Sequence, residues 1–411
     1  MDTPSGLGTL SGLDTLGILE RLVGFDTTSR NSNLELIEWV ETYLGDLGVA
    51  SSRVPDAAGV KAGLVAQIGP SHEGGVVLCG HTDTVPVDGQ PWTRPPFALS
   101  LSDDGTRAYG RGTTDMKGFI AASLAAVPTF LAADLQRPVI LALSYDEEVG
   151  CHGAPALARH LTTMPPVAAV VIGEPTSMQV VQAHKGVRVL RTTVTGLDAH
   201  SSRTDLAVSA VMAAARLVTY LEDTASRLAA EGVHNPAFTP PYTTINVGTI
   251  AGGQALNIVP RTCSFVWEYR GVPGEDIEAI QRNFESFARD EILPRLLAVT
   301  PDASIETSVT ASIPALDPSS NLAVRNLLQS LGIEGSDAAI AFGTDGSILQ
   351  EAGMPVAVCG PGSMMQGHQP DEFISLEELD ACDRFMARLA ASLAGAPAAD
   401  ADAADVDVDV G

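Results

Sequence analysis

Histidine and acidic residues recur in five short phrases of the sequence, each beside an apolar run. The phrases are CGHTDTVP from Cys79, GRGTTDMKG from Gly110, LSYDEEVG from Leu143, IGEPT from Ile172 and CGPGSMMQGHQPDEF from Cys359. Imidazole and carboxylate groups hold zinc-type ions in proteins, and ions held in this way activate water for hydrolysis. The pattern therefore indicates metal-dependent hydrolysis.

The first phrase places His81 and Asp83 directly after the run VVLCG. Residues two apart on an extended chain point the same way, so the Asp83 carboxylate can hold the second ring nitrogen of His81 while the first binds metal. Taken alone, the pair is weak support for a metal site, because a histidine at a strand end is more often simply hydrogen-bonded.

The acidic run Asp146-Glu147-Glu148 follows the apolar run VILALSY. Adjacent side chains of an extended chain point in opposite directions, so Glu147 and Glu148 cannot share one role. One can bind metal while the other faces the substrate. Three carboxylates at the end of a buried strand repel one another unless cations compensate or the turn is fully solvated, and both alternatives remain open for this phrase alone.

The second phrase is the centre of the prediction, because Asp115 follows a glycine-rich turn and begins an apolar helix at 119–131. That placement directs one carboxylate into a cleft. Two imidazoles and three carboxylates suit a pair of zinc-type ions that share one carboxylate, and water held there at near-neutral pKa is the expected nucleophile. The candidate ligands are His81, Asp115, Glu148, Glu174 and His368.

These residues need a layered α/β fold to bring them together. Short Val- and Ile-rich runs predict buried strands, and helical spacing of apolar positions predicts helices between them. Open α/β sheets bind ligands beyond the carboxyl ends of their strands, where the candidates lie. Strands are expected at 62–68, 76–79, 139–143 and 167–172, and helices at 13–23, 34–47, 118–131 and 154–161.

The pattern changes at Val187 and returns after Ile313. The intervening order of strands and helices, βαββαβ, is that of a ferredoxin-like sandwich, whose outer strand and long helix commonly form dimer contacts. Its strands are VRVLRTTVTG, TTINVGTIAG, CSFVWEYRG and 303–311, and its helices span 205–228 and 274–289. Beyond it, helices are expected at 320–331 and 376–393, and strands at 338–342 and 355–359.

The sequence thus predicts a catalytic domain of residues 1–186 and 312–394 with a central mixed, mostly parallel sheet. A lid and dimerisation domain of residues 187–311 is inserted in it. The remaining segment, 395–411, is acidic and of low complexity, so it is predicted to be a disordered tail.

The composition narrows the class of protein. With 24 basic and 50 acidic residues, the net charge of −26 argues against nucleic-acid or anionic-membrane partners. Five scattered cysteines indicate reduced thiols, and we find neither a signal peptide nor an apolar run of membrane-spanning length. Neither a GxSxG elbow nor a phosphate-binding loop is present. A cytoplasmic protein with a small-molecule substrate is expected.

The phrases resemble the di-metal aminoacylase and metallopeptidase family, from the first expected helix to the last. The sequence around the candidate ligands is similar to that of one branch of the family, whose members remove the acetyl group from N2-acetyl-L-ornithine in arginine biosynthesis. The similar segments include HTDTVPVDGQPWTRPPF, GRGTTDMKGF, GEPTSMQVVQAHKG and AHSS. The segment AFGTDGS, residues 341–347, departs from that branch toward desuccinylases of diamino acids.

The resemblance implies a zinc-peptidase-like catalytic domain and a role for each candidate. His81 and Glu174 would hold one Zn²⁺, Glu148 and His368 the other, and Asp115 would bridge them, with Co²⁺ able to substitute. Asp83 would orient His81, and Glu147 would be the general base for the attacking water. The peptide bond after Asp115 is expected to be cis.

For the inserted domain the resemblance implies a homodimer and further site residues. His200, in AHSS, would stabilise the oxyanion, commonly across the dimer. The substrate carboxylate would meet Asn257, Arg270, Gly343 and Thr344. Without the family, His200 is interpreted as a histidine at the start of the long helix, and exposed arginines are usually solvated. Desuccinylation, hydrolysis of another N-acyl amino acid or peptide, and a non-catalytic relative remain the alternatives.

Overall fold

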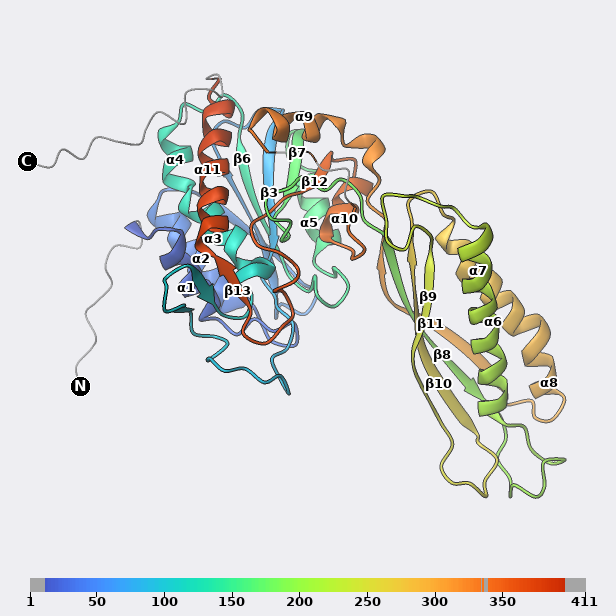
Figure 1. Ribbon diagram of the computed structural model, residues 1–411. Coiled ribbons are helices and arrows are strands. Elements are labelled where there is room, and N and C mark those ends of the chain that lie inside the picture. The colour runs from blue at the N-terminus through green and yellow to red at the C-terminus, as the bar shows by residue number, and fades with distance from the viewer. Residues whose placement is uncertain (1–11, 334, 336–338, 396–411) are drawn as a thin grey trace, which may run out of the picture. The chain divides into compact units, whose positions relative to one another are not determined.

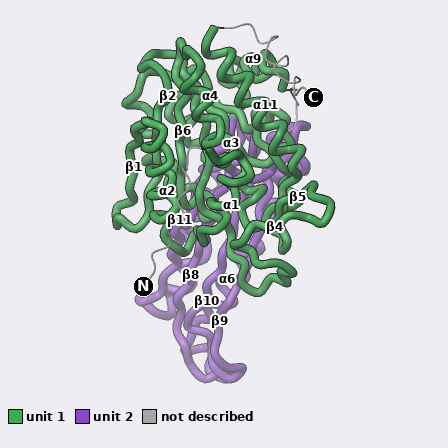
Figure 2. Tube along the Cα trace, turned by 90° about the vertical axis from the view of Figure 1, so that its left-hand side faces the viewer, with its two compact units in different colours: residues 1–182, 317–337, 344–411 green, residues 183–316, 338–343 purple. Residues whose placement is uncertain are grey.

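A computed structural model describes residues 12–333, 335 and 339–395 (Figure 1). The predicted disordered tail, apart from Gly395, lies outside the described residues. The chain divides into two compact units (Figure 2). Unit 1 comprises residues 1–182, 317–337 and 344–411, and unit 2 comprises 183–316 and 338–343. The predicted insertion, 187–311, falls within unit 2, which also takes the short segment before Thr344.

Unit 1 is built on a six-stranded sheet in the order β1-β2-β6-β3-β7-β12. The neighbours β6, β3, β7 and β12 run parallel, while β1 pairs with β2 and β2 pairs with β6 in antiparallel fashion. The sheet is therefore mixed and mostly parallel, as predicted. Its strands are β1 (Ser51–Pro55), β2 (Ala62–Ile68), β3 (Gly75–His81), β6 (Val139–Ser144), β7 (Val167–Ile172) and β12 (Val356–Val358).

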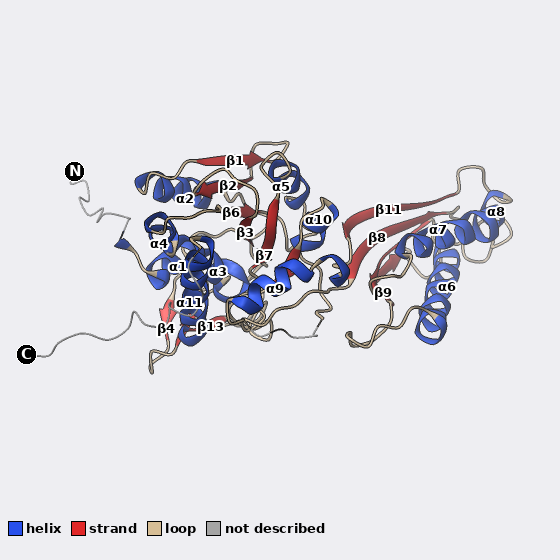
Figure 3. Cartoon of the chain, turned by 90° about the horizontal axis from the view of Figure 1, so that it is seen from above, coloured by secondary structure: helices blue, strands red, loops and turns tan. Residues whose placement is uncertain are grey.

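Helices cover both faces of this sheet (Figure 3). On one face, Leu78, Leu141 and Val171 belong to the main hydrophobic core. Val77 and Ile140 are also buried but lie outside that core. This burial on both faces explains the unbroken apolar runs of the central strands. The main core holds α1 (Thr15–Val23), α2 (Leu34–Asp46), α3 (Gly118–Ala125), α4 (Val127–Ala132), α9 (Leu322–Ser330) and α11 (Leu376–Leu393). Helices α5 (Ala154–Leu161) and α10 (Asp345–Glu351) contact each other on the opposite face.

The chain around Asp115 differs from the predicted helix start. Asp115 has φ −124° and ψ 92°, which is not helical, and regular helix begins only at Gly118. The peptide bond between Asp115 and Met116 is cis, as the resemblance implied. The predicted helix 118–131 also breaks at Ala126, because Pro128 lies in the first turn of a new helix, α4, and cannot continue the preceding one.

The prediction that no apolar run is long enough to span a membrane was wrong. The stretch Thr113–Ala132, with 20 residues and mean hydropathy 1.2, is long and apolar enough by length and composition. However, 67% of its 18-residue apolar window is buried, and α3 contacts α1 and α11. A buried core helix of unit 1 has the same length and composition.

Unit 2 follows the predicted order βαββαβ, and its sheet order is β11-β8-β10-β9 with antiparallel pairing throughout. The helices supply Leu217, Leu221 and Phe284 to a core against Phe265 and Trp267 of the sheet. Its elements are β8 (Gly186–Thr195), α6 (Ala210–Glu231), β9 (Thr244–Gly252), β10 (Thr262–Gly271), α7 (Ile277–Phe287), the irregular turn Ala288–Ile292, α8 (Leu293–Leu297) and β11 (Ser304–Ile313).

Two local predictions for the chain after β7 were wrong. The long helix does not start near His200: it begins at Ala210, where the Ser209 side chain accepts a hydrogen bond from the Met212 backbone N–H. The expected strand 338–342 is absent from its described residues, in which Ile340 makes only an isolated bridge to His184.

The chain also contains short elements that were not predicted. A three-stranded sheet joins β13, β5 and β4 in that order, and Phe373 of β13 pairs with Tyr109 of β5. Tyr109 lies a few residues before the Asp115 turn in the sequence. These elements include β4 (Ser100–Leu101), β5 (Arg107–Tyr109), β13 (Phe373–Ser375) and the 3₁₀ turn Pro318–Ser320, and β1, α8 and α10 were not predicted either.

Candidate metal centre

The candidate ligands lie where neighbouring strands of unit 1 end. His81 is the last residue of β3, Glu148 follows β6, and Glu174 follows β7. His368 lies in the loop after β12, and Asp115 lies in the turn before α3. Because β3, β6, β7 and β12 are parallel, their carboxyl ends share one edge of the sheet, which brings the side chains together.

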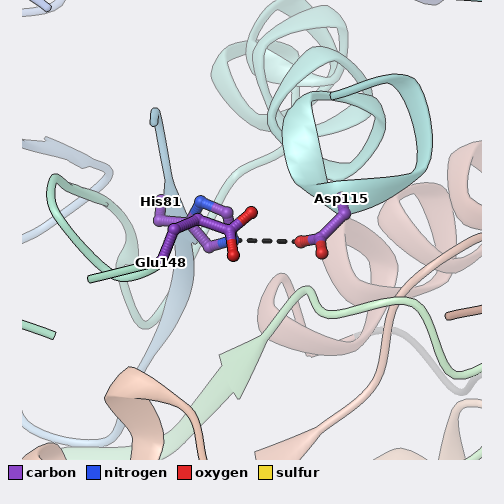
Figure 4. Close-up of side chains that lie close together, drawn as sticks. All are labelled: His81, Asp115 and Glu148. Atoms are coloured by element: carbon purple, nitrogen blue, oxygen red, sulfur yellow. Dashed lines mark hydrogen bonds and ion pairs between the residues drawn. The ribbon is translucent and has the colours of Figure 1, made fainter. Parts of the chain in front are cut away.

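Asp115 lies at the centre of the group. Its Oδ1 is 3.1 Å from Nε2 of His81, and its Oδ2 is 3.1 Å from Nε2 of His368. The same nitrogen of His368 is 3.0 Å from Oε2 of Glu148, and Nε2 of His81 is 3.7 Å from Oε1 of Glu174. Figure 4 shows the Asp115 carboxylate directed at the His81 ring, with Glu148 beside it. The two imidazoles therefore take different oxygens of one carboxylate.

Donor atoms in two overlapping triads lie within 4.8 Å of one another: His81, Asp115 and Glu148 in one, and His81, Glu147 and Glu174 in the other. Imidazole nitrogen and carboxylate oxygen are ligands of zinc-type ions, so the donor set fits two such ions. The resemblance implies that Glu147 is the base, but its carboxylate lies within 4.8 Å of the His81 and Glu174 donor atoms, so by distance it could also be a ligand.

The charges in this group are strongly perturbed. Burial, together with the neighbouring carboxylates, raises the pKa of Glu147 and of Glu174 well above the usual range, and burial raises that of Glu148 to about 7. Bonds to Asp115 and Glu148 raise the pKa of His368 to about 10. Crowded, buried carboxylates favour cations of any kind, and divalent ions would offset the repulsion more fully than protons.

In His81 and in Asp115, burial opposes the charged form and the neighbouring charges favour it. Burial opposes a charge on His81, but its bond to Asp115 and the charges of Glu174 and Glu147 raise its pKa well above the usual value. Burial likewise opposes the charge on Asp115, but the bonds to His368 and His81 hold the pKa of Asp115 below its usual value. Asp115 is therefore ionised within the group.

Asp83 lies beside His81, and its carboxylate pairs with the predicted ring nitrogen of His81 while it also binds other partners. Nδ1 of His81 is 3.0 Å from the backbone oxygen of Asp83 and 3.6 Å from its Oδ1. The carboxylate also accepts hydrogen bonds from the backbone N–H groups of Glu147 and Glu148 and from the Ser29 hydroxyl. Asp83 thus fixes the acidic turn, while its backbone contacts the imidazole.

Sequence reasoning missed Asp345, at the start of α10. It is buried, accepts a hydrogen bond from the Ser144 hydroxyl, and leaves Oδ1 without a partner among the described residues. Its charge contributes to the raised pKa of Glu147 and of Glu174. The signal in the sequence is the segment AFGTDGS, where an acidic residue directly follows the Gly343-Thr344 pair.

Lys61 was also missed. Its ammonium group bonds the Asp146 carboxylate and the Ser29 backbone oxygen, and Asp146 has φ 58°, in the left-handed region. This contact holds the turn that presents Glu147 and Glu148. The lysine lies 85 residues before its partner in the chain, so no local pattern connects the two.

The remaining predicted residues, apart from Thr344, belong to unit 2. The loops of His200 and Asn257 lie together: Ser201 N–H donates to the Asn257 carbonyl oxygen, and His200 bridges Ile258. Nδ1 of His200 is 2.8 Å from the Ser202 hydroxyl. Arg270 pairs with Glu268 at 3.2 Å, and Gly343 packs near Ile313. In unit 1, Thr344 caps α10 by accepting from Gly346 N–H.

Comparison with known proteins agrees with this architecture. Residues 77–392 match the family described as Peptidase family M20/M25/M40. An acetylornithine deacetylase of Myxococcus xanthus is 34% identical over 92% of this chain and 97% of its own. The chain belongs to this peptidase family, and it is accordingly a hydrolase of amide bonds.

Solved structures share the fold. An M20 family metallo-carboxypeptidase from Sulfolobus solfataricus has a TM-score of 0.72 at 17% identity, covering 93% of this chain and 99% of its own. A Bacillus subtilis protein described as a dinuclear metal-binding peptidase of the M20 family has a TM-score of 0.65 at 16% identity, covering 93% and 98%. At these identities the likeness supports the fold of unit 1 and unit 2 and not a substrate.

Proposed function

We propose that this chain removes the acetyl group from N2-acetyl-L-ornithine, giving L-ornithine and acetate, with the aid of two divalent metal ions. The substrate rests on the similarity to acetylornithine deacetylase along almost the whole chain. The chemistry rests on one observation, the sharing of the Asp115 carboxylate between His81 and His368.

Each of the five candidate ligands has a place in this proposal. His81 and Glu174, whose side chains lie 3.7 Å apart, would hold one ion, Glu148 and His368, 3.0 Å apart, would hold the other, and Asp115 would be a ligand common to both. Zn²⁺ is the preferred ion, with Co²⁺ as a substitute, since both suit imidazole and carboxylate donors. Ions bound here would polarise the amide carbonyl and make water acidic enough to attack it near neutral pH.

Glu147 is the general base in this proposal. Its carboxylate takes the proton from the attacking water as the new carbon–oxygen bond forms, and returns it to the amide nitrogen as the carbon–nitrogen bond breaks. Asp83 fixes the Glu147 backbone N–H at 3.1 Å, so the base is held on a rigid turn. The Asp146 bond to Lys61 supports the same turn. The second proton of the water ends on the amine as well, so acetate and the ammonium form of L-ornithine are released.

For unit 2 we propose a lid and dimerisation role. Support comes from within the unit: β9 is an edge strand with an exposed Ile250, and α6 exposes 68% of Met212, both of which suit contact with a second copy. His200 would stabilise the oxyanion, and Asn257, Arg270, Gly343 and Thr344 would meet the substrate carboxylate. A His200→Ala protein mixed with a Glu147→Ala protein should regain activity if subunits exchange and His200 acts across the dimer.

A cytoplasmic location also remains a proposal. All five cysteines are free and buried, which suits a reducing compartment.

The experiment that tests the substrate is an assay of acetate release with zinc or cobalt present. N2-acetyl-L-ornithine should be turned over fastest in a panel that includes a succinylated diamino acid and a dipeptide. Fast hydrolysis of one of those compounds with no acetate from acetylornithine would replace the proposed substrate. The segment 341–347, which departs from the deacetylase wording, favours the desuccinylase as the second candidate. A complete absence of turnover with metal bound would favour a non-catalytic relative.

A further inference from the structure

A buried ion pair lies directly behind the Asp115 turn. Nη1 of Arg111 is 2.8 Å from Oε2 of Glu372, and each side chain is only 1% exposed. Neither residue belongs to the candidate ligands or the base. Removing two charges from water costs stability unless every remaining polar atom is well paired, and apolar replacements of such pairs are often neutral or stabilising. Stability alone therefore does not account for this pair.

The Glu372 carboxylate is a hub of hydrogen bonds to the turn that carries Asp115. Oε2 accepts from the Gly112 backbone N–H at 3.0 Å as well as from Arg111. Oε1 accepts from the backbone N–H groups of Thr114 and Asp115 at 2.9 and 3.2 Å. One carboxylate thus replaces the helical bonds that this irregular turn lacks, and it fixes the backbone of the shared ligand.

Arg111 extends the same network to the second imidazole. Its Nη2 donates to Oε1 of Gln90 at 2.5 Å, and Nε2 of Gln90 donates to the backbone oxygen of His368 at 2.9 Å. Nη1 also donates to the Gln369 carbonyl oxygen at 3.3 Å, and the guanidinium lies 4.9 Å from the centre of the Trp92 ring. The loop of His368 is therefore bound to the residues that hold Asp115.

The chemistry of the four donors requires a carboxylate at position 372. An amide of the same size can accept at its oxygen, but its nitrogen would face N–H donors. Position 111 likewise requires an arginine, because the two terminal nitrogens of its planar guanidinium donate to Glu372 and to Gln90.

We propose that Arg111 and Glu372 are positioning residues for the metal pair, which set the distance between the shared carboxylate of Asp115 and the imidazole of His368. The inference rests on the metal ions of the proposed function. Hydrogen-bond partners of ligands orient them, and losing such a partner typically lowers metal affinity or activity 10- to 100-fold. Gln90 is the link through which the pair acts on His368.

The test is a titration of the metal-free full-length chain with Co²⁺, followed by calorimetry and by the visible spectrum of the bound ion. Glu372→Gln should weaken binding of both ions about 10- to 100-fold and change the spectrum, because the shared ligand moves. Gln90→Met should weaken mainly the ion held by His368 and Glu148. Excess metal should restore part of the activity of both variants.

Asp383→Asn is the matched control for a carboxylate changed to an amide. Asp383 accepts a hydrogen bond from Thr15 at 2.7 Å on another part of unit 1, so this variant should lose stability without losing metal affinity. Thermal unfolding of each metal-free variant separates the two effects. If Glu372→Gln does not fold, Gln90→Met decides the question in its place.

The outcomes separate this inference from the proposed function. Wild-type chain that does not bind two ions would refute the metal pair itself. Wild-type chain with two ions, and variants that bind Co²⁺ within twofold of its affinity and with its spectrum, would overturn the positioning role alone.

Discussion

His368 and Asp115 meet at 3.1 Å between Nε2 and Oδ2, although one lies in the loop after β12 and the other in the turn before α3. The other oxygen of Asp115 is equally close to His81. This arrangement gives one carboxylate to two imidazoles, which is the geometry expected of a ligand shared by two ions.

Replacing the shared carboxylate should affect both ions. Asp115→Asn removes the charge common to both half-sites, so metal analysis should find that both ions are lost together. His81→Ala and His368→Ala each remove a ligand from one half-site and should weaken mainly one ion. An Asp115→Asn protein that keeps two tightly bound ions would show that Asp115 is not shared.

Replacing the proposed base should separate chemistry from metal binding. Glu147→Gln should lower kcat about 10²- to 10⁴-fold, the range expected for loss of a general base, while two ions remain bound. Glu148→Gln is the matched control, since it should lose metal as well as activity. Because Glu147 also lies in a triad with His81 and Glu174, a loss of one ion from Glu147→Gln would assign it as a ligand instead.

The glycine before Glu174 is expected to be intolerant of any side chain. A Cβ at Gly173 would lie 2.0 Å from ring atoms of Phe119, which is buried in the main core. Gly173→Ala should therefore cost about 1–3 kcal/mol of stability through overpacking. Urea unfolding of the metal-free protein would measure this loss.

Gly45→Ala serves as the control for Gly173→Ala. Gly45 lies in α2, and a Cβ at this position would meet no atom within 4 Å. Alanine there should therefore be neutral or stabilise the helix by roughly 0.5–1 kcal/mol. Equal stability of the two variants would contradict the close approach of Phe119 to Gly173.

His184 should make unit 2 sensitive to acid. Burial lowers its pKa from 6.5 to about 4, so the unfolded chain binds the proton more readily than the folded chain. The contribution of His184 to stability is then complete above pH 6.5 and is lost as the pH falls toward about 4. His184→Gln should reduce the loss of unfolding free energy between pH 7 and pH 4.5 by roughly 2 kcal/mol. An unchanged pH dependence would contradict a buried, neutral His184.

Much of unit 1 could be predicted from the sequence because its strands are short, continuous and apolar. The limits 62–68 and 167–172 agree with β2 and β7, and the ligand phrases follow the strands because parallel strands expose their carboxyl ends together. The helix 376–393 was also correct, since its apolar period and its Ser375 cap are local signals. The order of elements in unit 2 follows from equally local patterns.

The start of α6 at Ser209 and the break at Pro128 were local signals that were overlooked, whereas other failures depended on contacts between distant segments. At the non-helical turn of Asp115, Glu372 accepts hydrogen bonds from the backbone N–H groups of Thr114 and Asp115. Glu372 lies far away in the sequence, so no pattern near Asp115 predicts this partner. The hydrogen bonds from the Glu147 and Glu148 backbone to the Asp83 carboxylate could not be predicted either, because those residues lie beside Asp83 only in the folded chain. In the described part of the strand expected at 338–342, Ile340 makes an isolated bridge to His184 and no regular strand forms.

The sequence by itself determined the kinds of ligand and the strand ends that carry them, because residue type and apolar period are local properties. Tertiary structure alone decided which oxygen of Asp115 each imidazole takes and which buried charges hold the turn. Hydrogen bonds and ion pairs depend on distances of a few ångströms between segments far apart in the chain, and those distances exist only after packing.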